Sequence, residues 1–153
     1  LDILVISPLP VPPSDLALDV SPELPEVSRI NSQLSDFCNA HAIPDEIQND
    51  LLIACEEILS NVIRHSSATI IRVFFAQQPH SVELRITDNG PPFDPLARPD
   101  PDLSLGLDDR RPGGLGIFMV RQMMDEVTYT QEDAFNVFTM IKRLPAPRAT
   151  DRT

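Results

Sequence analysis

The chain has 153 residues, of which 42% are hydrophobic and 5% aromatic, and this composition favours one folded domain with an aliphatic core. Its formal net charge is −11, so nucleic acid and anionic membranes, which both attract basic surfaces, are poor candidates for partners. The sequence contains no signal peptide and no apolar run near the ~18 residues that a membrane span needs, which predicts a cytoplasmic protein.

The first third of the chain predicts an extended segment, a strand and a helix. Residues 1–14 carry four prolines after a short apolar run, as in an extended linker or an added edge strand. Apolar residues alternate over 15–20, which predicts a strand, and Ser21 with Pro22 predicts that a helix starts immediately after it. The apolar residues that follow have helical spacing: Leu24, Val27, Ile30, Leu34 and Phe37.

The rest of the chain predicts two more helices and four more strands. Pro44 opens the second helix, whose apolar stripe consists of Ile47, Leu51, Cys55, Ile58 and Val62. The later elements are strands over 69–75 and 82–88, a proline-rich loop over 91–113, a helix over 115–126, a hairpin over 127–130 and 135–144, and a disordered tail over 145–153. This order predicts a two-layer α/β sandwich with one mixed, mostly antiparallel sheet over residues 15–144.

The two cysteines, Cys38 and Cys55, lie among apolar neighbours in the first two expected helices. A pair in this setting predicts buried thiols rather than a disulfide or a metal site. The first residue is leucine rather than methionine, which leaves open that the chain is cut from a longer regulator.

Glu57, Asn61 and Arg64 fall within about 60° of arc on the second expected helix, beside its apolar stripe. A carboxylate and an amide four residues apart could simply belong to a solvated helix face. They could also form half of a site, in which Asn61 offers an oxygen to Mg²⁺ and Glu57 accepts a proton. The spacing alone leaves both interpretations open.

Two later motifs are also ambiguous when each is taken alone. Asp88 ends an expected strand, and a turn that contains Gly90 follows it. This motif could be an ordinary turn, or it could place the Asp88 carboxylate to accept a hydrogen bond from an exocyclic amine. Gly113, Gly114 and Gly116 precede the third expected helix, where they form either a flexible hinge or a backbone cradle for an anion at the helix N-terminus. A loop as long as 91–113 is uncommon in a compact domain unless it is a lid over a ligand.

Taken together, the three motifs resemble the ATP-binding domain that gyrase, Hsp90, histidine kinases and MutL share. The residues that carry the resemblance are E-x-x-x-N followed by Arg64 and His65, then D-x-G-x-x-F-D, then the run GGLGIFMVRQMMDEVTY. Within that superfamily the chain is most similar to the anti-sigma-factor serine kinases of the RsbW and SpoIIAB type. The resemblance covers residues 15–144 and implies a Bergerat-type ATP-binding fold.

The resemblance implies a role for each matching residue. It implies that Glu57 is the general base, that Asn61 coordinates Mg²⁺ on the phosphates of ATP, and that residues 94–113 are the ATP lid. Asp88 would hold the adenine amine, and Thr139 would lie near the adenine. The other implied nucleotide contacts are Arg64, His65, Gly90, Phe93, Arg110 or Arg111, Gly113, Gly114, Leu115, Gly116 and Ile117.

The carboxylate at Glu57 favours a serine/threonine kinase or an ATPase over a histidine kinase. An imidazole needs little proton removal before it attacks phosphorus, whereas a serine hydroxyl needs a base beside it. The resemblance therefore implies a homodimeric, ATP-dependent serine/threonine kinase that phosphorylates a STAS-domain anti-anti-sigma factor and also sequesters a sigma factor. The alternative is an ATP- or ADP-dependent partner-switching module with little or no kinase activity.

Overall fold

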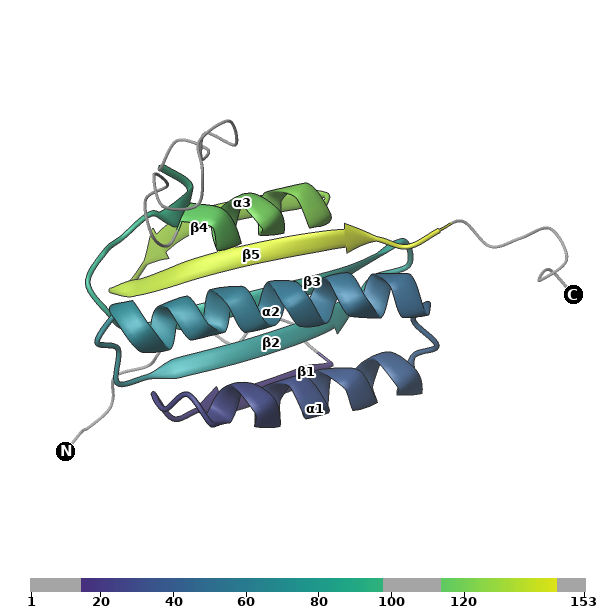
Figure 1. Cartoon of the computed structure of the whole chain (residues 1–153), viewed down its shortest axis with the longest axis horizontal. Helices are drawn as coiled ribbons and strands as arrows, with labels where there is room; N and C mark the ends of the chain where they lie inside the picture. The colour runs from purple at the N-terminus through teal and green to yellow at the C-terminus, as the bar shows by residue number, and fades with distance from the viewer. Residues whose placement is uncertain (1–14, 98–113, 146–153) are drawn as a thin grey trace, which may run out of the picture.

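The computed structural model describes residues 15–97 and 114–145 of the chain (Figure 1). The expected N-terminal segment 1–14, residues 98–113 of the expected lid and residues 146–153 of the expected tail lie outside this part. The helical elements are α1 (Glu26–Ala40), α2 (Asp45–His65), the short 3-10 helix η1 (Pro95–Ala97) and α3 (Gly114–Met123). The strands are β1 (Leu16–Val20), β2 (Ile71–Gln77), β3 (Ser81–Asp88), β4 (Glu126–Glu132) and β5 (Phe135–Arg143).

The described elements form two layers, with α1, α2 and α3 on one face of a five-stranded sheet (Figure 1). The strand order is β1-β2-β3-β5-β4, and all four pairings are antiparallel. The predicted two-layer sandwich is confirmed, but the sheet is antiparallel throughout rather than mixed. The two helices between β1 and β2 carry the chain out and back, which makes these strands antiparallel. The single helix α3 makes β4 run in the same direction as β3, and β5 lies between them.

The core lies between the helices and the sheet, and strand alternation selects its residues. On β2 and β3, Val73, Phe75, Leu84 and Ile86 are at most 1% exposed and belong to one cluster with the buried faces of α1 and α2. The predicted stripe of α2 is buried from Ile47 to Ile58, and Val62 is partly buried. Within the described part of the chain, no helix combines the length and the apolar character that a membrane span needs.

Both cysteines are free and buried, as predicted. Burial raises the pKa of the Cys38 thiol to about 11. It raises the pKa of the Cys55 thiol to about 12, with a smaller contribution from the negative charge of Glu56. Both thiols are therefore protonated and unreactive near neutral pH.

The predicted helix start at Ser21 and Pro22 is wrong, because α1 begins at Glu26. A second proline, Pro25, explains the difference, since the residue before a proline avoids helical backbone angles. The Glu26 carboxylate instead reaches back and accepts a hydrogen bond from the Ser21 backbone N–H at 3.0 Å. Hydrogen bonds from Arg29 lower the pKa of Glu26 to about 2, so this connection is charged at neutral pH.

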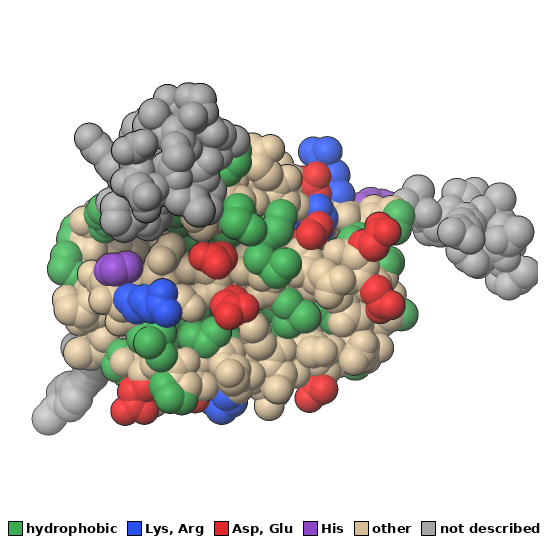
Figure 2. Space-filling view, viewed as in Figure 1, with side chains coloured by type: hydrophobic (Ala, Val, Ile, Leu, Met, Phe, Trp, Pro, Cys, Tyr) green, Lys and Arg blue, Asp and Glu red, His purple; other side chains and the backbone are tan. Residues whose placement is uncertain are grey.

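The helix face of the molecule carries the acidic character of the chain in a dispersed form. Figure 2 shows acidic side chains spread over this face and basic side chains mainly at its margins. The last turn of α2 carries two basic residues, Arg64 and His65, at the end of the helix that leads to the cavity described below.

Candidate functional site

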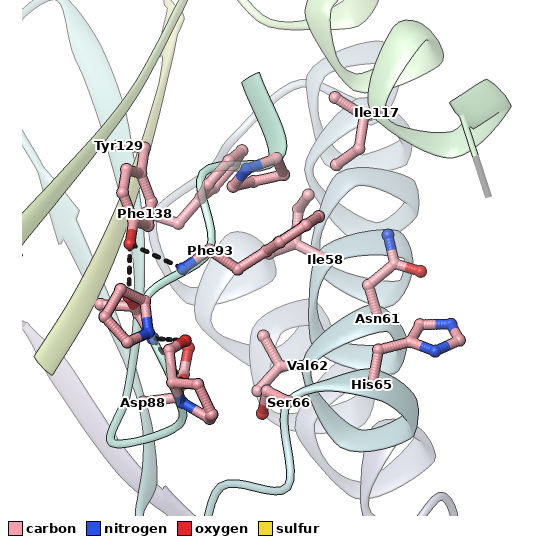
Figure 3. A pocket seen from close by; sticks show the side chains of 14 residues that line it. Ile58, Asn61, Val62, His65, Ser66, Asp88, Phe93, Ile117, Tyr129 and Phe138 are labelled. Atoms are coloured by element: carbon pink, nitrogen blue, oxygen red, sulfur yellow. Dashed lines mark hydrogen bonds between the residues drawn. The ribbon is translucent and has the colours of Figure 1, made fainter. Parts of the chain in front are cut away.

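A cavity of about 510 Å³ opens where the C-terminal half of α2 meets the ends of β3 and β5 (Figure 3). Its volume is in the range of small-molecule sites. The lining residues are Ile58, Asn61, Val62, His65, Ser66, Asp88, Pro91, Pro92, Phe93, Pro95, Ile117, Tyr129, Asn136 and Phe138. The α2 residues among them recur at helical spacing, so one face of that helix forms a wall.

Asp88 is the buried carboxylate of the cavity, with 5% of its surface exposed. It ends β3 directly opposite Asn136 of β5. Its Oδ1 accepts hydrogen bonds from the Gly90 backbone N–H at 2.8 Å and from the Asn136 side-chain amide at 3.1 Å. Neither hydrogen bond engages Oδ2, so the carboxylate is held in place while one oxygen remains for a ligand.

The orientation of Asn136 is set by a short chain of hydrogen bonds. The Tyr129 hydroxyl donates to Oδ1 of Asn136, and it accepts a hydrogen bond from the Phe93 backbone N–H at 3.2 Å. Nδ2 of Asn136 therefore points at Asp88, and it also donates to the carbonyl oxygens of Gly90 and Pro91. These contacts join β4, β5 and the segment after β3 into one polar floor.

Gly90 is required by close packing within the protein. A Cβ atom at this position would lie 2.5 Å from the Ser66 carbonyl oxygen and 2.9 Å from Oδ1 of Asp88. The turn after β3 therefore rests against the C-terminal end of α2. Only glycine allows this approach, and the approach brings the buried carboxylate into the cavity.

The upper walls of the cavity are apolar. Ile58 of α2, Ile117 of α3 and Phe138 of β5 line it and are at most 8% exposed. Figure 3 shows Phe93, which is 60% exposed, extending from the segment after β3 toward α2. Flat apolar walls above one buried carboxylate suit a heteroaromatic ring that carries an N–H donor.

Glu57 lies beside the N-terminal end of α3. A Cβ atom at Gly116 would overlap the Glu57 carboxylate, so the two residues are in direct contact. Gly116 lies in the first turn of α3, which begins at Gly114. The first backbone N–H groups of a helix have no partner within it and attract anions. The predicted base therefore stands next to the part of the fold that is suited to a phosphate.

The structure brings most of the predicted site residues together. Asn61, His65, Asp88, Phe93 and Ile117 line the cavity, and Gly90 belongs to its floor. Figure 3 shows Asn61 and His65 on the side of α2 farther from Asp88. Gly114 and Leu115 open α3, whereas Arg110, Arg111 and Gly113 lie outside the described residues.

Two predicted residues lie away from the cavity and from the first turn of α3. Arg64 is exposed on the last turn of α2. Thr139 lies on β5 between Arg85 and Thr128, on the sheet face opposite the helices. Because successive residues of a strand point to opposite faces, the inward position of Phe138 excludes Thr139 from the cavity. Asn136, two residues before Phe138, is the β5 residue that lies beside Asp88.

Sequence reasoning missed several lining residues, above all Tyr129 and Asn136. In the stretch FNVFTM of β5, apolar residues occur at both odd and even positions. Alternation therefore does not reveal whether the odd or the even residues point toward the helices. One signal was present: Tyr129 is the only tyrosine of the chain, it ends the last motif, and it alternates with Val127 as in a strand.

The family model of the histidine kinase-like ATPase domain matches residues 20–142, which include every residue that lines the cavity. The chain belongs to the histidine kinase-like ATPase domain family. The family assignment confirms the predicted resemblance and the predicted nucleotide-binding class. It covers the expected domain 15–144 except for a few residues at each end.

Two relatives of this histidine kinase-like ATPase domain are named as protein kinases. The serine-protein kinase RsbW of Staphylococcus aureus is 32% identical over 121 residues, which is 72% of this chain and 76% of that protein. The serine/threonine-protein kinase BtrW of Bordetella bronchiseptica is 32% identical over 94 residues, which is 59% of this chain and 66% of that protein. These relatives support the prediction that the chain is an ATP-dependent protein kinase of the anti-sigma-factor type.

Solved structures confirm the fold. The RsbU and RsbW domains of Rv1364c from Mycobacterium tuberculosis superpose with a TM-score of 0.63 and 18% identity, over 88% of this chain and 32% of that one. The SiaB–SiaC complex from Pseudomonas aeruginosa superposes with a TM-score of 0.54 and 15% identity, over 86% of this chain and 91% of that one. This histidine kinase-like ATPase domain therefore shares its fold with the matched part of each of these chains.

Proposed function

We propose that the chain is a Mg²⁺- and ATP-dependent serine/threonine protein kinase that phosphorylates a STAS-domain anti-anti-sigma factor. The observation that carries the proposal is the position of Glu57, whose carboxylate contacts Gly116 in the first turn of α3. Transfer of a phosphoryl group to a hydroxyl requires a base close to the bound phosphates, and the N-terminus of α3 is suited to bind phosphate. Sequestration of a sigma factor and a homodimeric state belong to the same proposal and rest on the resemblance alone. The cytoplasmic location in this proposal rests on the sequence prediction given above.

The cavity fits a nucleotide. The free oxygen of Asp88 can accept a hydrogen bond from the exocyclic amine of adenine, and the apolar walls can enclose the ring. The first turn of α3 can donate backbone N–H groups to the phosphates. Asn136 acts through Asp88, because its amide holds the carboxylate in position.

The metal is proposed to depend on the nucleotide. Among the described residues, no group of three His, Cys, Asp or Glu side chains could hold a metal ion. Mg²⁺ commonly binds through substrate phosphates, several waters and one or two protein oxygens. Asn61, on the cavity wall, would supply the amide oxygen.

The proposed reaction transfers the γ-phosphoryl group of ATP to a serine. The serine Oγ forms a bond to the γ-phosphorus while the bond between that phosphorus and the oxygen of the departing ADP breaks. Glu57 accepts the proton of the hydroxyl, and the backbone N–H groups at the start of α3 offset the charge of the phosphates. A Mg²⁺ ion held through Asn61 would supply further positive charge there. The acceptor serine must approach the half-buried Glu57 side chain beside the first turn of α3.

The proposal is tested in two steps on the whole chain. Saturation with Mg²⁺-ATP is expected to raise the melting temperature by roughly 5–10 °C at about 100 times Kd. Incubation with γ-labelled ATP and a STAS-domain protein is then expected to label that protein, and a STAS variant with alanine at the acceptor serine serves as the control. Binding without transfer to any STAS candidate would favour the partner-switching module, and no binding would reject both functions.

Asn61→Ala is expected to weaken ATP binding on the order of tenfold when Mg²⁺ is present and little when it is absent, because the change removes a metal ligand rather than a base contact. Titration calorimetry with and without EDTA measures the difference. Asn49→Ala, at an exposed position of the same helix, is the matched control. An equal loss under both conditions would show that Asn61 has a structural role instead.

A further inference from the structure

Four residues on the helix-free face of the sheet are buried. Figure 1 shows α1, α2 and α3 together on the opposite face. The residues that alternate away from the helices include Phe74 and Ala76 of β2, Thr87 of β3 and Val137 of β5. Their exposed fractions are 6%, 8%, 5% and 3%, and none of them belongs to the core cluster under the helices. We call these four residues the back-face band.

The two edge strands of the same face are not buried in this way. Ala17 and Asp19 of β1 and Thr128 and Thr130 of β4 point to the helix-free side and are exposed. A phenylalanine or valine on an open sheet face keeps a substantial part of its surface in contact with water. The band is therefore covered, and no helix of the described part of the chain lies on that face to cover it.

The band begins where residues 1–14 join the described chain. The Asp15 backbone N–H donates to the Phe75 carbonyl at 2.8 Å, and the Asp15 carboxylate accepts from the Gln77 backbone N–H at 2.7 Å. These two contacts place Asp15 beside Ala76, the first residue of the band. The remaining chain on the N-terminal side of Asp15 therefore starts at one end of the band.

The length and composition of residues 1–14 match the band. Val137 lies two strand spacings across and about four residues along the sheet from Ala76, a distance of roughly 17 Å that about five extended residues span. Val11 lies four residues before Asp15 and Leu9 lies six residues before it, so these two apolar residues bracket that distance, and the four prolines of the segment favour an extended path.

Beside the band, one buried polar atom lacks a hydrogen-bond partner among the described residues. Nε of Arg85, which lies between Phe74 and Thr139 on the helix-free face, is buried without a hydrogen-bond partner, although Nη2 of the same side chain pairs with Glu83 at 2.9 Å. A buried donor of this kind favours a neighbour that offers acceptors. A proline-rich segment has carbonyl oxygens and few N–H groups, so it suits this position.

We propose that the helix-free face of the sheet is the docking surface of the chain's own residues 1–14, with Leu9 and Val11 over the back-face band. Thr87 and Val137 are the sequence neighbours of Asp88 and Asn136, so the docked segment packs directly behind the polar floor of the cavity. The proposal stands on burial and chain geometry, and it holds or fails independently of the kinase function.

Thiol labelling of the full chain tests this docking. Thr87→Cys places a small reporter in the band, and the native Cys38 and Cys55 add little background because both are 0% exposed. Labelling is compared between the reporter alone and the reporter combined with Leu9→Ser and Val11→Ser. Leu24→Ser is the matched control, because Leu24 is an apolar residue that is 44% exposed and outside the segment. Val137→Cys serves as a second reporter.

The expected result is slow labelling of the reporter and labelling at least about tenfold faster in the Leu9/Val11 variant, with no change in the Leu24 variant. Labelling that is fast in every variant would overturn the proposal, because the face would be open. Slow labelling that the Leu9/Val11 changes do not affect would also overturn it. If that protection disappears on dilution, a second copy of the chain covers the face instead.

Discussion

Glu57→Gln is expected to slow phosphoryl transfer to the STAS protein by at least about a hundredfold while ATP affinity stays nearly unchanged. Glutamine preserves the shape of the side chain and its contact with Gly116, so the α2–α3 junction should be retained. It removes only the ability to accept the proton of the serine hydroxyl. The loss should therefore appear in the rate of the chemical step and not in the affinity for ATP.

Single-turnover transfer from γ-labelled ATP measures this rate, and calorimetry measures the affinity. Glu56→Gln is the matched control, because Glu56 is the adjacent carboxylate of α2 and is exposed. A loss of binding equal to the loss of rate would place Glu57 among the structural residues. Unchanged transfer would remove it from the mechanism.

Asp88→Asn is expected to weaken ATP binding by roughly 10- to 150-fold, because a hydrogen bond with a charged partner contributes about 1.5–3 kcal/mol. The asparagine can still accept the hydrogen bonds from Gly90 and Asn136 with its one oxygen. The position that faces the ligand then becomes an amide NH₂, which cannot accept from the adenine amine. The loss should therefore fall on recognition of the base.

A purine nucleotide without the exocyclic amine isolates this effect. The parent protein should bind ATP more tightly than the analogue, and Asp88→Asn should lose that preference. Asp36→Asn, an exposed position on α1, controls for the change in net charge. Melting without nucleotide separates a recognition defect from unfolding. A variant that keeps the full preference for ATP would exclude Asp88 from adenine recognition.

The helix that carries the candidate base is predictable from the periodicity of its own residues. The stripe from Ile47 to Ile58 repeats with helical period, and this repeat orients the whole of α2 against the core. Once the stripe is buried, Glu57 and Asn61 must stand beside it, one turn apart. The end of β3 at Asp88 was predictable for a similar reason, because alternation ends where the Asn89–Gly90 turn begins.

The residues that surround Asp88 depend on contacts between distant parts of the chain. Strand β5 is apolar on both faces, so its sequence permits either Asn136 or Thr139 to point at the cavity, and the pairing of Asp88 with Asn136 selects the first. The contact between Glu57 and Gly116 joins residues far apart in the chain. Local periodicity orients a side chain relative to its own helix or strand. Strand register and helix packing depend on partners distant in sequence, and these partners brought Tyr129 and Asn136 to the site.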